Sequence, residues 1–154
     1  MKSRIRDPEH MKQLIDFQGL GLDRGIHPTD IDGIIEYHDL RYIVFEIKSV
    51  RAQLPKGQRL ALQRMVDDFA RAGKRTVVVI AEHDTDPKDG PVIAADCNVR
   101  AVYFWNERRW RPPHQKVTLR ELVDMFLDYS TDDPIVRATR RPMTMNEAHT
   151  LIDF

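Results

Sequence analysis

Two runs of consecutive apolar residues constrain the fold of this chain most strongly. The first, "YIVF", lies within residues 41–50, and the second, "VVVIA", covers residues 77–81. Uninterrupted runs rich in β-branched and aromatic residues are typical of strands that are covered on both faces. We therefore expect both runs to be central strands of a mixed sheet that is flanked by helices, an α/β architecture.

The surrounding pattern supplies the neighbouring elements. Residues 31–37 are expected to form a strand that pairs with residues 41–50 through a tight turn at 38–40. Residues 57–72 carry apolar side chains at helical spacing, which predicts an amphipathic helix between the two apolar strands. The other expected elements are helices over 7–18 and 116–130, a strand over 99–105, and a short helix after residue 144.

Length and composition limit the class of protein. The 154 residues suit one domain over residues 1–130, followed by a tail over 131–154. The 24 basic and 24 acidic residues cancel, which argues against non-specific coating of nucleic acid but not against a local basic groove. The single cysteine excludes an internal disulfide framework. With no apolar leader or membrane span in the sequence, we expect a cytoplasmic protein without a membrane partner.

Charged residues gather at one end of the predicted hairpin. Asp30 and Asp32 open the first strand, and Glu46 and Lys48 close the second. Residues two apart in a strand share a face, and antiparallel pairing about the 38–40 turn makes paired positions add up to about 78. Asp32 then lies opposite Glu46, and Asp30 lies opposite Lys48. A slip of one residue would reverse the face, but in this register all four charges converge.

Adjacent carboxylates repel each other unless a cation lies between them. Mg²⁺ prefers oxygen ligands and is usually held by one or two carboxylates together with water and substrate phosphate. A lysine beside such a pair can help to position or deprotonate water, or stabilise phosphate. The set suits attack of water on a phosphodiester. Taken singly, each residue is explained as well by a turn, a cap or an ordinary salt bridge, whereas the apolar strand context favours a site for the whole set.

The segments "TDID" and "FEIK" resemble the motif of the PD-(D/E)XK nuclease superfamily, including its small phage-type and Holliday-junction-resolvase-like members. The resemblance covers roughly residues 7–83 and implies a restriction-endonuclease-like core in the order helix, three strands, helix, strand (αβββαβ). It implies that Asp32, Glu46 and the backbone carbonyl of Ile47 bind Mg²⁺ or Mn²⁺, with Lys48 as the catalytic lysine. Because the proline stands two residues before Asp30, the pattern does not decide between the two aspartates, and Asp30 remains a further metal-ligand candidate.

The resemblance also assigns residues outside the hairpin. Gln58, early in the helix after the lysine strand, matches a glutamine that many members carry there, and we assign it to the catalytic site. Resolvase-like members carry an acid in the first helix that completes the metal site; Glu9 is the first candidate and Asp16 the second. The residues expected to contact the DNA backbone are Arg51, Lys56 and Arg59.

The resulting hypothesis is a Mg²⁺- or Mn²⁺-dependent deoxyribonuclease, an endonuclease rather than an exonuclease, acting on duplex, branched or single-stranded DNA. A homodimer would provide two sites for cutting both strands. The alternative is a non-catalytic DNA- or protein-binding module that retains the fold, and a third possibility is a structural protein whose C-terminal part docks a partner. His27 and His83 are weaker site candidates. Residues 103–113 suit either stacking on nucleic acid or, as we favour, a strand followed by a turn.

Overall fold

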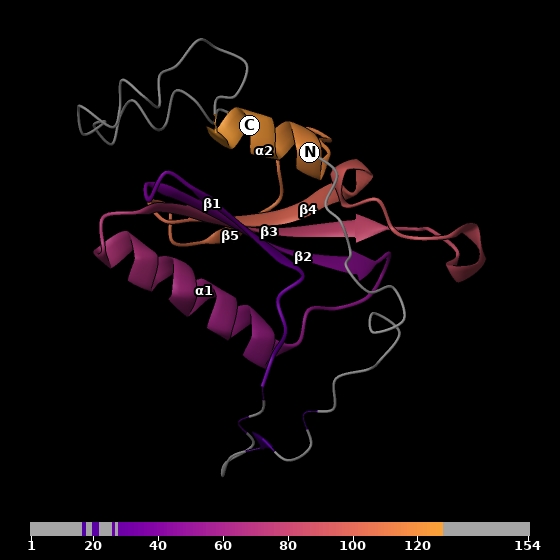
Figure 1. Cartoon of the computed structure of the whole chain (residues 1–154), viewed down its shortest axis with the longest axis horizontal. Coiled ribbons are helices and arrows are strands. Elements are labelled where there is room, and N and C mark those ends of the chain that lie inside the picture. Colours follow the sequence, from indigo (N-terminus) through magenta and orange to yellow (C-terminus); the bar gives the residue numbers. More distant parts are fainter. Residues whose placement is uncertain (1–16, 18–19, 22–25, 27, 128–154) are drawn as a thin grey trace. The chain divides into compact units, whose positions relative to one another are not determined.

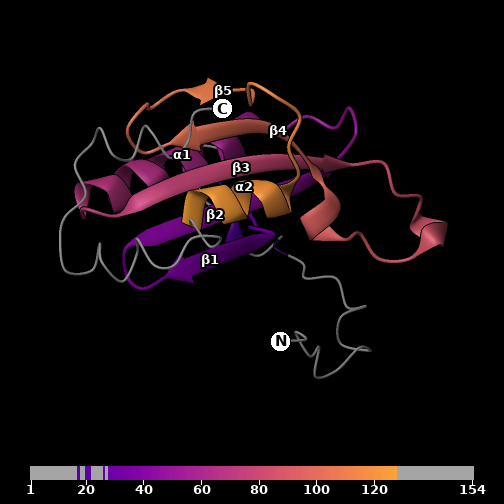
Figure 2. The same cartoon turned by 90° about the horizontal axis from the view of Figure 1, so that it is seen from above.

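The computed structural model describes residues 17, 20–21, 26 and 28–127. The chain divides after Asp30 into two units, and the second unit contains the sheet and both α-helices. Its five strands lie side by side in the order β1-β2-β3-β4-β5, as Figure 2 shows. The strands are β1 (Gly33–Tyr37), β2 (Arg41–Ser49), β3 (Arg75–His83), β4 (Asn98–Phe104) and β5 (Trp110–Arg111), and the helices are α1 (Lys56–Arg71) and α2 (Leu119–Leu127).

The α/β class and the mixed sheet are confirmed. β2 and β3 are parallel and are joined through α1, whereas β1 pairs with β2, β4 with β3, and β5 with β4 in antiparallel fashion. Figure 1 shows α1 and α2 on opposite faces of the sheet. The two apolar runs therefore lie in its middle, where both faces are covered: Ile43 packs in the cluster that includes α2, and Val44 in the cluster that includes α1.

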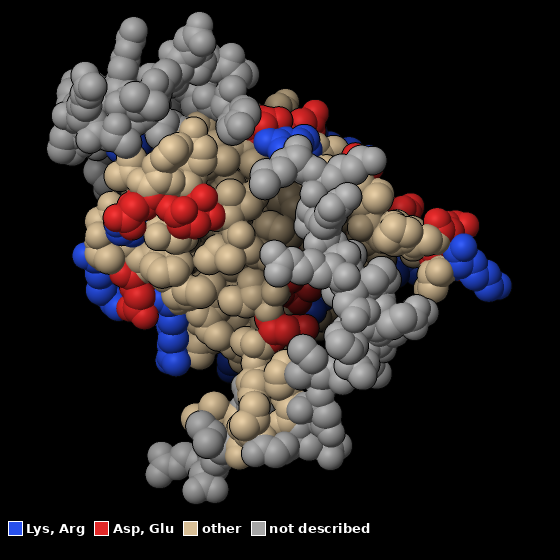
Figure 3. Space-filling view, viewed as in Figure 1, with Lys and Arg blue, Asp and Glu red and all other residues tan. Residues whose placement is uncertain are grey.

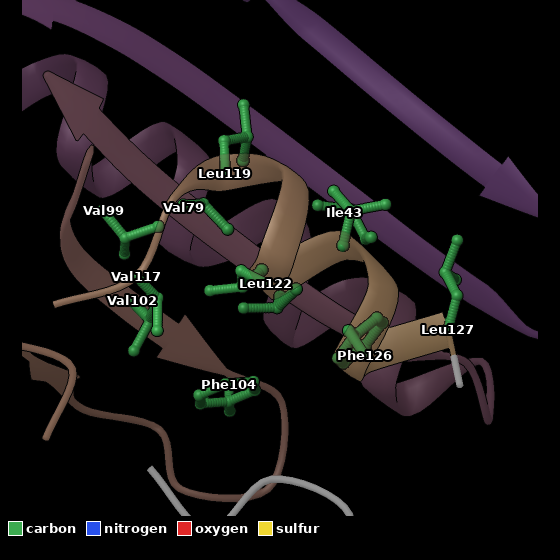
Figure 4. Packing of buried hydrophobic residues seen from close by; sticks show 12 residues of the cluster. Ile43, Val79, Val99, Val102, Phe104, Val117, Leu119, Leu122, Phe126 and Leu127 are labelled. Carbon is green, nitrogen blue, oxygen red and sulfur yellow. The ribbon is translucent and has the colours of Figure 1, made fainter. Parts of the chain in front are cut away.

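The second helix is held by its cap and by its apolar face. The backbone N–H of Thr118 donates to the Glu121 carboxylate at 2.7 Å, and the N–H of Glu121 donates to the Thr118 hydroxyl at 3.2 Å, which is a complete capping box. In Figure 4 the side chains of Leu122 and Phe126 point from α2 toward the sheet residues of the same core. In the described part of the chain, neither helix is both long and apolar enough to cross a membrane.

Most predicted boundaries agree with the structure to within about two residues. The exceptions concern the ends and the order of the elements. The helix predicted over residues 116–130 begins at Leu119 rather than at residue 116, because Thr118 is its cap. Among the described residues, two strands rather than three precede α1, so the αβββαβ order is not found there. The helices expected over 7–18 and after 144, and the tail over 131–154, lie outside the described residues.

Candidate functional site

The hairpin pairs in the predicted register. Gly33 lies opposite Phe45, and every pair in the β1–β2 ladder adds up to 78. Asp32 directly precedes β1, so the same register directs it toward Glu46. A hydrogen bond fixes this end of the hairpin: the backbone N–H of Ile47 donates to Oδ2 of Asp32 at 2.6 Å. The predicted convergence of Asp32 with the end of β2 is therefore confirmed.

Glu46 is a buried carboxylate with one oxygen satisfied. The residue is only 1% exposed. Its Oε1 lies 2.6 Å from Nζ of Lys48, and its Oε2 is buried without a hydrogen-bond partner among the described residues. An unsatisfied buried polar atom costs about 1–3 kcal/mol, and more when it carries charge. Such an atom is compatible with a water or a cation from outside the chain.

The same face of the sheet carries the other predicted catalytic residues. Glu46 and Lys48 lie two and four residues after Val44, so all three leave β2 on the face that packs against α1. Gln58 is 7% exposed and belongs to the buried stripe of α1 that also contains Leu62. The structure thus places Glu46, Lys48 and Gln58 in the layer between β2 and α1.

The donors at this end of the hairpin fit a hard divalent cation. No cluster of three or more His, Cys, Asp or Glu side chains suited to a metal occurs in the described residues, so the set consists of two carboxylates, those of Asp32 and Glu46. The N–H and C=O of one strand residue point to the same side, which directs the Ile47 carbonyl toward Asp32. Two carboxylates and a carbonyl suit Mg²⁺ or Mn²⁺, which complete their coordination with water and phosphate. They do not suit a closed zinc site.

Several predicted residues are not brought to this face. Glu9, Asp16 and His27 lie outside the described residues, and Asp30 belongs to the first unit, so their roles stay predictions. His83 pairs with Ser49 at the end of β3 and faces away from Glu46. Its Nδ1 is buried and has no hydrogen-bond partner within the described segments.

The residues predicted to contact DNA are exposed where β2 leads into α1. Arg51, Lys56 and Arg59 have no ion-pair partner among the described residues. The N-terminus of α1 follows Pro55, has no side-chain cap, and has no acidic residue in its first turn. The positive end of the helix dipole therefore adds to these cations and favours an anion such as phosphate. In the view of Figure 3, Lys and Arg side chains lie toward the margins of the described surface rather than in one continuous patch.

The favoured interpretation of residues 103–113 is confirmed in part. Tyr103 is buried in the core next to α1, and the chain turns after β4, but Trp110 and Arg111 form the short strand β5 rather than part of the turn. The arginines of this segment have partners within the chain: Arg108 lies 3.3 Å from Asp67, and Arg111 lies 2.8 Å from Glu107. These contacts leave little of the segment available as a stacking platform for bases.

Sequence reasoning missed Arg100 and Glu82. Glu82 is the register partner of Lys48 on the adjacent parallel strand. Nη1 of Arg100 lies 3.8 Å from Oε2 of Glu82 and donates to the carbonyl of Ala52 at 2.7 Å. Both residues lie within strands and belong to no recognisable motif, so only the pairing of β3 with β4 reveals their proximity to the site.

Comparison with protein-family models, with curated proteins and with solved structures finds no match to this chain. Its function is therefore inferred from the geometry at the end of the hairpin.

Proposed function

We propose that this protein is a Mg²⁺- or Mn²⁺-dependent DNA nuclease with a restriction-endonuclease-like core, a member of the PD-(D/E)XK superfamily. The observation that supports this most directly is the state of Glu46, which is buried, bound to Lys48 through one oxygen, and without a hydrogen-bond partner among the described residues at the other. A buried ion pair that served only stability would need its remaining lone pairs satisfied within the chain. The unsatisfied oxygen instead favours an external cation.

Each residue of the candidate site has a separate role in this proposal. The hydrogen bond from the Ile47 N–H orients Asp32, so that its other oxygen is left for a ligand. A bound Mg²⁺ or Mn²⁺ would stabilise negative charge on the phosphate and make water a better nucleophile. Lys48, whose side chain is 24% exposed, holds its ammonium against Glu46 and at the surface, where it can contact water or phosphate. Gln58 supports the site from α1.

The test is cleavage of labelled duplex, single-stranded and four-way-junction DNA with Mg²⁺ or Mn²⁺. Wild type is compared with Glu46→Gln and Lys48→Ala, and Glu36→Gln is the matched control. Glu36 is an exposed carboxylate on the same strand and the same face as Asp32, at the other end of β1. We expect metal-dependent cutting that falls about 100-fold or more in the two site variants and is unchanged in the control.

A non-catalytic binding module predicts a different pattern. In that case no substrate is cut, and wild type, Glu46→Gln and Lys48→Ala bind DNA equally with or without metal. This result would overturn the proposed nuclease activity, and the charges of the hairpin would then serve the fold alone.

A further inference from the structure

A β-bulge interrupts the sheet beside the candidate site. Ile80 pairs with Ala101, whereas Ala81 pairs with Val99, so Arg100 is an extra residue in β4 without a partner in the ladder. Bulges bend a strand and redirect the side chain of the extra residue, and they are frequent next to active sites. The bulge thus supplies a structural reason for the direction of the Arg100 side chain.

The redirected side chain reaches the segment that follows Lys48. Arg100 donates to the carbonyl of Ala52, in the connection between β2 and α1, and lies beside Glu82, the register partner of Lys48. Both contacts use Nη1 of the guanidinium. Within the part of the chain that the structure describes, the N–H groups on Nε and Nη2 have no hydrogen-bond partner and are open to a ligand, in the fork geometry that suits two oxygens of a phosphate.

Arg100 borders an open hollow of about 410 Å³ at the ends of β3 and β4. Its other wall is the segment that carries His114 and Lys116, both exposed and without an ion-pair partner among the described residues. Glu82 is the one carboxylate that lines the hollow, and Arg100 lies against it. Asn98 and Gln115 add amide donors. The lining therefore has an excess of cations and hydrogen-bond donors, which favours an anionic ligand.

We propose that this hollow is a phosphate-binding subsite for the nucleic-acid strand whose backbone is cut at Asp32, Glu46 and Lys48. The proposal rests on the proposed nuclease function. Neighbouring strands lie about 4.8 Å apart, so β4 is about 10 Å from β2 across the sheet. The subsite therefore lies on the order of 10 Å from the scissile phosphate, within reach of a short stretch of the same strand. Arg100 binds the phosphate oxygens directly, and Lys116 adds a mobile positive charge.

Lys116→Ala is the most informative variant, because an exposed lysine with no ion-pair partner among the described residues can be removed without disturbing the fold. Lys88→Ala is the matched control, since Lys88 is also exposed, in the 3-10 helix Pro87–Asp89, and does not line the hollow. Arg100→Lys is the second test variant, because it keeps the charge but loses the fork of donors.

The measurement is fluorescence anisotropy of labelled duplex and single-stranded DNA, without activating metal, over a range of NaCl concentrations. We expect Lys116→Ala to weaken binding about three- to tenfold and to reduce the slope of log K against log salt by about one, while Lys88→Ala stays within about twofold of wild type. Arg100→Lys should weaken binding to a similar extent.

The possible outcomes distinguish a failure of the proposed subsite from a failure of the proposed nuclease function. If Lys116→Ala and Arg100→Lys bind as tightly as Lys88→Ala while wild type cuts DNA, the subsite is refuted and the nuclease function stands. If wild type binds DNA in a Lys116-dependent way but cuts nothing, the nuclease function fails and the anion-binding hollow stands. Absence of any DNA binding overturns the subsite as well.

Discussion

Replacing Glu46 by glutamine should separate metal binding from folding. The substitution keeps the shape of a side chain that is buried, removes its charge, and replaces the carboxylate by a neutral amide. Lys48 loses its partner but is partly exposed, so its ammonium can turn to water. Removing one partner of a buried ion pair is strongly destabilising when the remaining charge stays buried, a cost that the partly exposed Lys48 ammonium can avoid. In the absence of metal, we therefore expect the free energy of unfolding of Glu46→Gln to lie within about 1 kcal/mol of the wild-type value, or above it.

Metal should raise the Tm of wild type but not that of Glu46→Gln. A ligand that binds the folded state stabilises it by about 2.7 kcal/mol when its free concentration is 100 times Kd. In a protein of this size, that free energy corresponds to a rise in Tm of roughly 5–10 °C. Glu46→Gln lacks the charged ligand that the cation needs and should show no such rise. Lys48→Ala should retain it, because the lysine is not a ligand.

The assay is thermal unfolding followed by circular dichroism, in EDTA and then in a titration with Mg²⁺ or Mn²⁺. Glu36→Gln is the control for unspecific binding of cations to carboxylates, and it should shift as wild type does. The reasoning is refuted if Glu46→Gln gains as much stability from the metal as wild type, or if neither metal changes the Tm of wild type.

Three further predictions concern the fold around the site. In Gly33→Ala the new Cβ would overlap the Phe45 ring, so the ring must shift; we expect a loss of about 1–3 kcal/mol in urea unfolding, and an unchanged urea midpoint would contradict this. Thr118→Ala removes the cap of α2 and should cost about 1 kcal/mol by the same measurement, whereas Thr118→Ser should retain most of it. The Arg111 guanidinium, which donates hydrogen bonds of 2.8 and 2.9 Å, holds the pKa of Glu107 below its usual value of 4.5. Because a lowered pKa stabilises the fold above the unfolded-state pKa, the stability gap between wild type and Glu107→Gln should be full at neutral pH and shrink as the pH falls below about 4.5; a gap that does not change with pH would refute this.

The hairpin and its charges were predicted from the sequence because they depend on local rules. Side chains alternate along a strand, and a tight turn sets the register, so the turn at residues 38–40 was enough to direct Asp32 toward Glu46. The apolar runs likewise identified β2 and β3 as central, since only burial on both faces explains such runs. The capping side chains of α2 were recognisable for the same reason, because their partners lie three residues apart.

The expectation of three strands before α1 failed among the described residues, because it came from a resemblance to other proteins and not from a strand pattern in this chain. The aromatic and arginine-rich segment had two interpretations until its partners were visible. Its arginines are neutralised by Asp67 and Glu107, and the contact with Asp67 joins parts of the chain about forty residues apart. No local periodicity carries such information.

The sequence by itself thus determined the class of fold, the register of the hairpin and the convergence of Asp32 with the end of β2. Only the tertiary structure decided that one oxygen of Glu46 is buried and unsatisfied, that Gln58 lies in the same layer, and that Arg100 bulges out of β4 toward the segment after Lys48. The physical reason is the distance along the chain over which each kind of interaction acts. Side-chain alternation, turns and caps act over a few residues, whereas burial and the pairing of β3 with β4 depend on segments that meet only when the whole sheet has formed.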